Sequence, residues 1–224
     1  MVNLYLPVKK LLGDNLILEI NPQKIDQLTG APLRPVDKVV TRMFDKLSVS
    51  KKHTRAIFRG FVVSGNWDKE AAPICESEKY LKILDLIQNK HEYRKSIFYH
   101  EIKNKIDNGK IYRHKNILIK NDEDINGFFK KYMLEMIDSL QNEGYLDSKA
   151  GKHGTALIGR NGELIKAFNG QHRFFAAKIL GLNNIKLLIT TIHRDWFRYT
   201  ESGFYGKRKK NLIRSLRNVE IYHT

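Results

Sequence analysis

The sequence predicts an α+β fold, in which a small mixed sheet with helices forms the core and a mostly helical part precedes it. Two short apolar runs, 155–159 and 163–168, flank Asn161-Gly162, and this dipeptide between apolar runs is a strong signal for a β-hairpin. A helical stretch then starts at Gln171 and ends at Gly181, a residue that suits the left-handed position after a helix. The run 185–192 is rich in β-branched and leucine side chains and predicts a further strand.

The part of the chain before this core contains a predicted strand at 16–20 and several amphipathic helices. Apolar side chains recur at helical spacing along each helix, which is typical of a helix that packs one face against a core. In the longest helix the apolar stripe runs from Ile125 to Leu140, and Asp122 lies at the N-terminus, where negative charge complements the helix dipole. The predicted helices cover residues 35–47, 77–89, 93–107 and 122–142.

We expect three segments along the chain. Residues 1–115 form a helical N-terminal extension that can shape a pocket for an acceptor substrate, 116–200 form the core, and 201–224 form a basic tail. The tail predicts a short basic amphipathic helix, because three of its apolar residues lie at helical spacing between arginines: Leu212, Ile213 and Leu216. This helix is expected to contact nucleic acid, an anionic surface, or the acidic start of the helix at 122–142.

The composition excludes several classes of protein. The chain of 224 residues is long enough for one buried core with a helical extension, and no apolar run approaches the roughly 18 residues of a transmembrane helix. The N-terminus lacks the apolar run of a signal peptide, and the single Cys75 cannot form an internal disulfide. We therefore expect a cytoplasmic protein without a membrane partner. The motifs of P-loop, dinucleotide-binding and zinc sites are not present in the sequence.

Positive charge is the dominant global feature. The chain has 40 Lys and Arg against 24 Asp and Glu, which gives a formal net charge of +16. A basic balance favours anionic partners such as nucleic acid, nucleotides or an anionic membrane surface. Eight of the Lys and Arg residues lie between Arg34 and Gly60. This segment is interpreted either as a solvated basic face or as a footprint for phosphates.

A polar cluster, Asn169-Gly170-Gln171-His172-Arg173, lies where the second strand of the hairpin passes into the helix. The first backbone N–H groups of a helix lack intrahelical partners and carry the positive end of the helix dipole. Gly170 has no Cβ to block the approach of a ligand, Arg173 supplies a fork of donors, and His172 adds one more. The cluster is interpreted either as an anion cradle that suits phosphate or as a helix cap, a turn and two surface residues.

Together with Ala176-Ala177 and Gly181-Leu182, this cluster resembles the core of the ParB/sulfiredoxin superfamily. Members of that superfamily carry a Gly-x-x-Arg or Gly-x-His-Arg box at a strand-to-helix junction. The form in this chain is especially similar to the Asp-Gly-Gln-His-Arg box of DndB-like proteins and the Asp-Gly-His-x-Arg box of free serine kinases. The resemblance covers roughly residues 116 to 196 and implies a ParB/sulfiredoxin-like core.

The resemblance implies a nucleotide site at the box. ATP or another NTP would place its phosphates on Gly170, Gln171, His172 and Arg173, with Arg160 reaching over them from the hairpin turn. Mg²⁺ would bridge phosphate oxygens, and no cluster of protein side chains is expected to hold a metal by itself. Asn169 stands where the related families have Asp, and an amide cannot act as a general base. Beside Asn169, His172 and Arg173, the candidate catalytic residues therefore include Glu163 or Asp68 as the base.

Four residues are candidates for the substrate side of the site, namely Gly65, Trp67, Asp68 and His193. Gly65, Trp67 and Asp68 resemble a Gly-x-Trp-Asp segment that precedes the box in ParB-like proteins. Trp67 either anchors a core or stacks on a base or sugar, and Asp68 either holds a turn or binds a metal or hydroxyl group. His193 ends the strand at 185–192, which we expect beside the strand that leads into the box. It either shares a rim with His172 or only terminates the strand.

Two functions follow from these observations. The first is a nucleotide-binding enzyme, either an NTP-dependent phosphotransferase for a small molecule, sugar or nucleoside, or an NTP hydrolase. The alternative is a DNA-binding or DNA-processing protein, which the basic charge and the resemblance to DNA-associated families favour. Sulfiredoxin chemistry is disfavoured, because Gln171 occupies the position of the thiol nucleophile.

Overall fold

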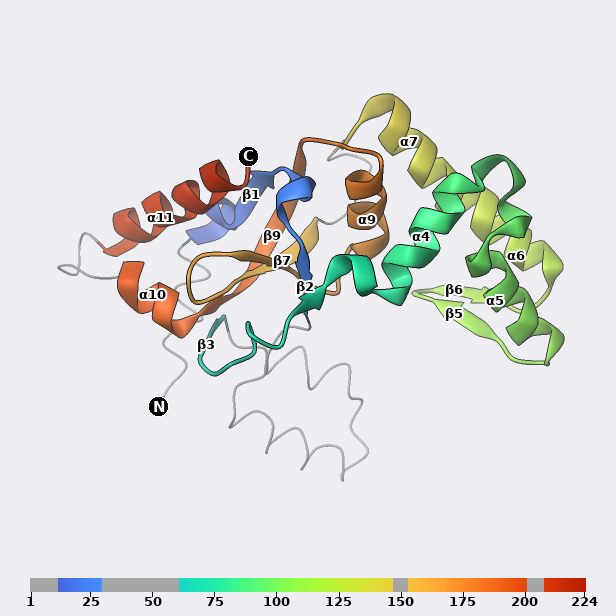
Figure 1. Cartoon of the computed structure of the whole chain (residues 1–224), viewed down its shortest axis with the longest axis horizontal. Coiled ribbons are helices and arrows are strands. Elements are labelled where there is room, and N and C mark those ends of the chain that lie inside the picture. Colours follow the sequence, from blue (N-terminus) through green and yellow to red (C-terminus); the bar gives the residue numbers. More distant parts are fainter. Residues whose placement is uncertain (1–11, 30–60, 147–152, 201–207) are drawn as a thin grey trace, which may run out of the picture. The chain divides into compact units, whose positions relative to one another are not determined.

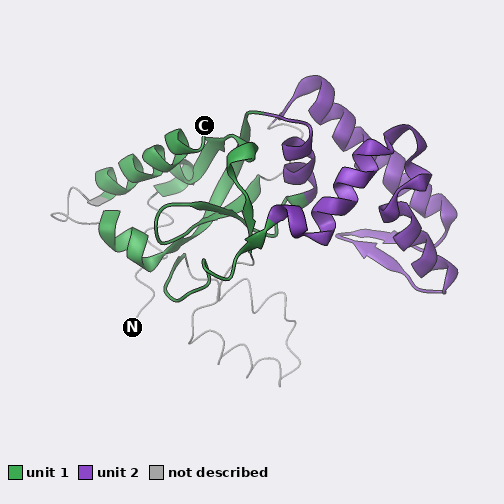
Figure 2. Cartoon of the chain, viewed as in Figure 1, with its two compact units in different colours: residues 1–73, 153–171, 183–224 green, residues 74–152, 172–182 purple. Residues whose placement is uncertain are grey.

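The computed structural model describes residues 12–29, 61–146, 153–200 and 208–224 (Figure 1). The predicted helix at 35–47 and the whole basic segment 34–60 lie outside the described residues. The chain divides into two compact units (Figure 2). Unit 1 comprises residues 1–73, 153–171 and 183–224, and unit 2 comprises residues 74–152 and 172–182.

Unit 1 is built on a mixed sheet, as the sequence predicts. Its strands are β1 (Ile17–Ile20), β2 (Gln27–Leu28), β3 (Val62–Val63), β4 (Ala72–Pro73), β7 (Gly154–Ile158), β8 (Leu164–Lys166) and β9 (Ile185–His193). The order is β1-β9-β7-β8-β2-β4, and β3 pairs with β9 beyond the end of β1. The β7–β9, β2–β8 and β3–β9 pairs are parallel, and the other pairs are antiparallel.

The predicted hairpin is confirmed, and it forms the centre of this sheet. β7 and β8 pair antiparallel, and Gly162 in the turn has φ +93°, a conformation that favours glycine. The expectation that the last strand lies beside the strand leading into the box is wrong. β9 pairs with β7 instead, because the outer edge of β8 is occupied by β2, where Leu28 pairs with Lys166.

Two helices of unit 1 follow β9, namely α10 (Arg194–Thr200) and α11 (Arg208–Tyr222), and α11 packs against α10 and β1 (Figure 1). The predicted amphipathic helix of the tail is therefore confirmed. Its buried side is apolar, with Leu212, Leu216 and Val219 all at most 6% exposed. The Glu220 carboxylate also accepts a hydrogen bond of 2.7 Å from the backbone N–H of Glu19 in β1.

Unit 2 is mainly helical. Its helices are α4 (Glu78–Gln88), α5 (Ile97–Asp107), α6 (Asp122–Phe128), α7 (Glu135–Glu143) and α9 (Gln171–Ile179). The first residue of α9, Gln171, belongs to unit 1. A hairpin of β5 (Tyr112–His114) and β6 (Ile117–Ile119) completes the described part of unit 2. The helices predicted at 77–89, 93–107 and 122–142 are confirmed. α5 begins later than predicted because the Ser96 hydroxyl caps its N-terminus by accepting the Tyr99 N–H. A π-helical turn at Phe129–Leu134 joins α6 to α7.

The remaining described elements are short helical turns at Gly13–Leu16, Pro22–Lys24, Ile74–Glu76 and Lys90–Lys95. Within the described ranges, no helix is both long enough and apolar enough to cross a membrane.

The two units differ from the three segments expected from the sequence. The described residues before 74 contribute β1 to β4 to the sheet of unit 1, where the sequence was expected to form a helical extension. The segment after 207 is part of the same unit, because α11 buries its apolar face there. The expected core 116–200 is divided between the units. The reason is physical: strand pairing and helix packing join segments that lie far apart in the chain, and local patterns do not report those partners.

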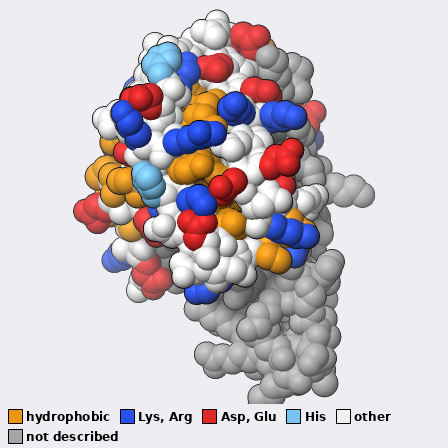
Figure 3. Space-filling view, turned by 90° about the vertical axis from the view of Figure 1, so that its right-hand side faces the viewer, with side chains coloured by type: hydrophobic (Ala, Val, Ile, Leu, Met, Phe, Trp, Pro, Cys, Tyr) orange, Lys and Arg blue, Asp and Glu red, His pale blue; other side chains and the backbone are white. Residues whose placement is uncertain are grey.

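Charged side chains of opposite sign alternate on the face of unit 2 drawn in Figure 3. Several charged side chains of unit 2 form ion pairs, within one helix or between two elements. Lys82 bridges Glu78 and Glu101, and Lys90 contacts Asp138. By sequence, unit 2 has 17 Lys and Arg against 13 Asp and Glu, a net charge of +4, whereas unit 1 has 23 against 11, a net charge of +12. The excess positive charge of the chain is therefore concentrated in unit 1.

Candidate functional site

Gly170 of the predicted box packs against backbone. Its φ is +73°, and a Cβ placed on it would lie 2.6 Å from the Cα of Gly154 in β7. A side chain at 170 would therefore clash with the backbone of β7, so the strand or the junction would have to shift. The expectation that Gly170 admits a ligand is corrected: the close approach that requires glycine is the contact with β7.

A buried lysine holds the neighbouring residue of the box. The Lys166 side chain is fully buried, and its Nζ donates to the carbonyl oxygens of Thr155, Ala167 and Asn169 at 3.0, 2.6 and 2.6 Å. The Asn169 carbonyl also accepts the Thr155 N–H at 3.2 Å. Lys166 thus fixes the strand-to-helix junction by donating to three carbonyls of that region from inside the core. Sequence reasoning missed it, and the one available signal is a lysine inside the apolar run 163–168.

The His172 side chain is buried in unit 2. It is 9% exposed, and its ring stacks on His114 with centroids 4.9 Å apart. Burial, together with the nearby His114, lowers the pKa of His172 to about 3. The ring is therefore neutral near pH 7 and adds no charge to a phosphate site. Gln171 is also buried, at 5% exposed.

Arg173 is the box residue best placed to bind an anion. Its guanidinium lies over the ring of Tyr145, 5.3 Å from the centroid. Its Nε is buried and has no hydrogen-bond partner among the residues that the structure describes. A buried donor without a partner costs free energy, and an anion at the start of α9 would supply the missing acceptor.

Arg160 and Asp68 form a buried ion pair in unit 1. The Asp68 side chain is 1% exposed, and Arg160 Nε and Nη2 donate to its two oxygens at 2.7 and 2.8 Å. The Arg160 N–H adds a third hydrogen bond of 3.1 Å. Nη2 also donates to the Gly65 carbonyl and to Asn66 Oδ1, both at 3.0 Å. This arrangement ties the loop after β3 to the hairpin turn.

Asp68 is a weak candidate for a general base. Burial raises the pKa of its carboxyl, but the hydrogen bonds from the Arg160 side chain and backbone outweigh burial and lower it to about 2. A carboxylate with so low a pKa, and with both oxygens engaged, is a poor proton acceptor. The geometry assigns Asp68 to the positioning of Arg160 instead.

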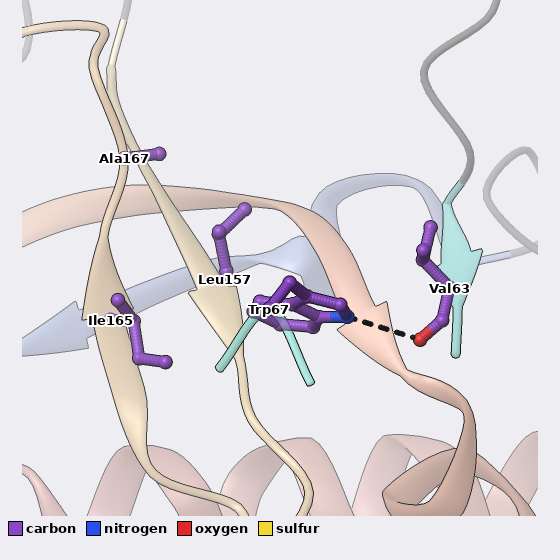
Figure 4. Close-up of a cluster of buried hydrophobic side chains, with 5 residues drawn as sticks. All are labelled: Val63, Trp67, Leu157, Ile165 and Ala167. Atoms are coloured by element: carbon purple, nitrogen blue, oxygen red, sulfur yellow. Dashed lines mark hydrogen bonds between the residues drawn. The ribbon is translucent and has the colours of Figure 1, made fainter. Parts of the chain in front are cut away.

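Trp67 and His193 belong to the same cluster. Trp67 is 7% exposed and packs with Val63, Leu157 and Ile165, while its Nε1 donates to the Val63 carbonyl at 3.3 Å (Figure 4). It is therefore a core residue, and stacking on a ligand is excluded by burial. His193 is 1% exposed, lies 5.6 Å from the Trp67 ring, and places Nε2 2.8 Å from the Gly65 carbonyl. Its Nδ1 accepts the Asp195 N–H at 3.1 Å, which assigns the proton to Nε2.

The predicted site residues of unit 1 thus fall into two groups. Gly170 contacts Gly154 at the start of β7, whereas Arg160 follows the end of that strand. Six extended residues span roughly 20 Å, which is more than an arginine side chain reaches. The expectation that Arg160 covers phosphates at Gly170 is therefore wrong. The same separation keeps Glu163, at the hairpin turn, away from the box.

A groove of about 1080 Å³ opens beside this hairpin turn. Its wall residues come from the hairpin turn, α10, α11 and the segments around β2 and Asp68. Three cations line it, namely Lys24, Lys69 and Arg160, and three acids do so as well, namely Asp26, Glu163 and Asp68. Glu163 accepts the Asn161 N–H at 2.9 Å. Among the described residues, no group of three or more His, Cys, Asp or Glu side chains is placed to hold a metal ion.

Two exposed tyrosines stand at this groove. Tyr199 of α10 is 84% exposed and Tyr222 of α11 is 76% exposed, and both line the groove. Trp196 also lines the groove and packs on the hairpin turn, since a Cβ on Gly162 would lie 3.0 Å from its Nε1. Sequence reasoning did not find these tyrosines, since an isolated tyrosine carries no signal of its exposure.

No protein-family model, curated protein or solved structure matches this chain. Its function therefore has to be argued from the fold and the geometry of these sites.

Proposed function

We propose that this chain is a cytoplasmic nucleic-acid-binding protein that contacts phosphates through helix α11. The observation that carries the proposal is the charge of α11, which holds five Lys and Arg against one Glu, in a unit whose net charge by sequence is +12 against +4 for unit 2. Phosphate contacts supply most of the sequence-independent affinity of proteins for nucleic acid. A unit with such an excess of cations therefore suits a polyanion.

The exposed face of α11 supports this proposal. Lys210, Arg214 and Arg217 are exposed and follow one another at spacings of four and three residues, so they lie on one side of the helix. The stripe is roughly 10 Å long at 1.5 Å per residue, a length over which one nucleic-acid strand carries about three phosphates. The Arg217 side chain forms an ion pair with Glu220 at 2.5 Å, and it is 49% exposed.

The test is the salt dependence of binding. A variant with Lys210→Gln, Arg214→Gln and Arg217→Gln is expected to lower the slope of log affinity against log salt by about 2, because each lost phosphate contact removes roughly 0.7 to 0.9. Fluorescence anisotropy with labelled oligonucleotides between about 50 and 200 mM salt measures that slope.

A matched control carries Lys95→Gln, Lys110→Gln and Lys120→Gln, three exposed lysines of unit 2. This control lowers the net charge by three, as the α11 variant does, and it is expected to leave the slope of log affinity against log salt nearly unchanged. Equal slopes for all three proteins, or binding by the wild type that does not depend on salt, would overturn the proposal.

A second candidate is an NTP-dependent phosphotransferase or hydrolase on a ParB/sulfiredoxin-like core. Its support is the buried Nε of Arg173 at the start of α9, which has no hydrogen-bond partner among the described residues, together with the position of the box between β8 and α9. ATP or another NTP would place a phosphate at Arg173, with Mg²⁺ bridging phosphate oxygens. An acceptor would be a small molecule, sugar or nucleoside.

Equilibrium binding of ATP, CTP and GTP with Mg²⁺ tests this second candidate. Arg173→Ala is expected to weaken binding by about 10-fold or more, since a hydrogen bond to a charged group contributes roughly 1.5–3 kcal/mol. Lys178→Ala removes a cation from the other end of the same helix and should leave affinity unchanged. Unchanged affinity in Arg173→Ala would refute a phosphate site at the box.

A further inference from the structure

We infer that the groove beside α11 receives unpaired bases, so that the ligand of this chain is single-stranded nucleic acid. The inference deepens the proposed function and rests on it. It is carried by the exposed tyrosines, by the charge balance of the groove and by the position of the cationic stripe on α11.

The two tyrosines are suitable platforms for bases. Tyr199 and Tyr222 are 84% and 76% exposed although both line a concave surface. Aromatic rings are normally withdrawn from water, and an exposed ring in a groove is the arrangement on which single-stranded nucleic acids stack their bases. Tyr199 belongs to α10 and Tyr222 to α11, so the groove presents an aromatic ring from each of two helices.

The charges of the groove suit a base better than a phosphate. Its three cations are balanced by three acids, and the Arg160 guanidinium is bound to the Asp68 carboxylate. Amide side chains, including Gln27 and Asn218, complete the polar lining. A balanced set of donors and acceptors fits the uncharged, polar edges of a base, whereas a phosphate would meet repulsion from the carboxylates.

The phosphates have a separate place on the same helix. With about 100° between successive residues, Ser215, Asn218 and Tyr222 share the side of α11 that lines the groove. The adjacent side carries Lys210, Arg214 and Arg217. A single strand can therefore run along the cationic stripe with its bases turned into the groove. A duplex keeps its bases paired and stacked inside, so it can use the stripe only.

The experiment compares single-stranded and double-stranded probes of about 15 nucleotides, a length within the range of single-strand binding sites. Labelled oligothymidylate, oligouridylate and a mixed-sequence duplex are titrated by fluorescence anisotropy at one salt concentration. The wild type should bind both single strands more tightly than the duplex, and the relative affinity of the two single strands distinguishes DNA from RNA as the preferred source.

Tyr199→Ala and Tyr222→Ala should each weaken single-strand binding by about 5- to 100-fold, the effect of losing one base–aromatic stack, and leave duplex binding unchanged. Tyr222→Trp should retain single-strand binding because the indole also stacks. Phe168→Ala, which removes an aromatic side chain that is 61% exposed but does not line the groove, serves as the control and should bind as the wild type.

The failures of the two proposals are distinguishable. Tyrosine variants that bind single strands like the wild type, or a wild type that prefers the duplex, would overturn the inference while leaving the role of α11 intact. If replacing Lys210, Arg214 and Arg217 by Gln changes the affinity for neither single strands nor duplex, the proposed function itself is overturned.

Discussion

Replacing Asp68 by Asn is expected to lower the free energy of unfolding by roughly 1.5–3 kcal/mol, the contribution of hydrogen bonds to a charged group. The Asp68 carboxylate accepts three hydrogen bonds from Arg160, a residue 92 positions away in the chain. The amide keeps the shape but not the charge, so Arg160, whose side chain is 24% exposed, loses the carboxylate that it pairs with. Urea denaturation followed by circular dichroism measures the change.

Two further variants make this result specific. Asp195→Asn removes a carboxylate from the same region, but its side chain is 62% exposed, so we expect a change within about 0.5 kcal/mol. The double variant Asp68→Asn, Arg160→Met should be less destabilised than the sum of the two single variants, because no unpaired charge remains. Additive effects of the two substitutions would show that the pair does not stabilise the fold as a unit.

The effect of Asp68→Asn should also depend on pH. Because the pKa of Asp68 is lowered from 3.8 to about 2 in the folded protein, folding favours its charged form. The stability that this carboxylate contributes is therefore complete above pH 3.8 and is lost as the pH falls toward 2. The difference in unfolding free energy between the wild type and Asp68→Asn should be constant from neutral pH to about 4 and shrink below it.

Gly170→Ala is expected to destabilise the protein by about 2–4 kcal/mol. A Cβ at this position lies 2.6 Å from the Cα of Gly154, so the strand or the junction has to move, and overpacking of this kind costs roughly 1–3 kcal/mol. The φ of +73° adds about 1 kcal/mol for a residue with a side chain. Thermal and urea denaturation both report the loss.

Gly181→Ala is a matched control for this substitution. Gly181 has the same φ of +73°, but a Cβ there meets nothing within 4 Å. Gly181→Ala should lose only about 1 kcal/mol of stability, the cost of a positive φ for a residue with a side chain. The difference in stability between the two variants therefore measures the contact with Gly154. If both variants lose the same stability, Gly170 is not required for packing against β7, and the interpretation of this glycine as a ligand-admitting residue regains support.

The sequence was most informative where structure depends on neighbouring residues. The turn at Asn161-Gly162, the end of α9 at Gly181 and the amphipathic helix around Leu212 were all predicted, because turn chemistry and helical periodicity act over a few residues. The sequence also singled out Trp67, Asp68, Arg160 and His193, and the structure brings these four together. Their predicted roles differed from their observed contacts, since residue types alone do not specify partners.

By itself, then, the sequence determined the α+β class, the central hairpin, most of the helices and the excess of positive charge. Only the tertiary structure decided what surrounds each candidate residue. It placed Gly170 against Gly154, buried Lys166 beneath three carbonyls, paired Asp68 with Arg160 and left Tyr199 and Tyr222 exposed at one groove. The physical reason is that burial and pairing depend on contacts between distant segments, here β1 to β4 and α11 with the hairpin, and local patterns contain no information about those contacts.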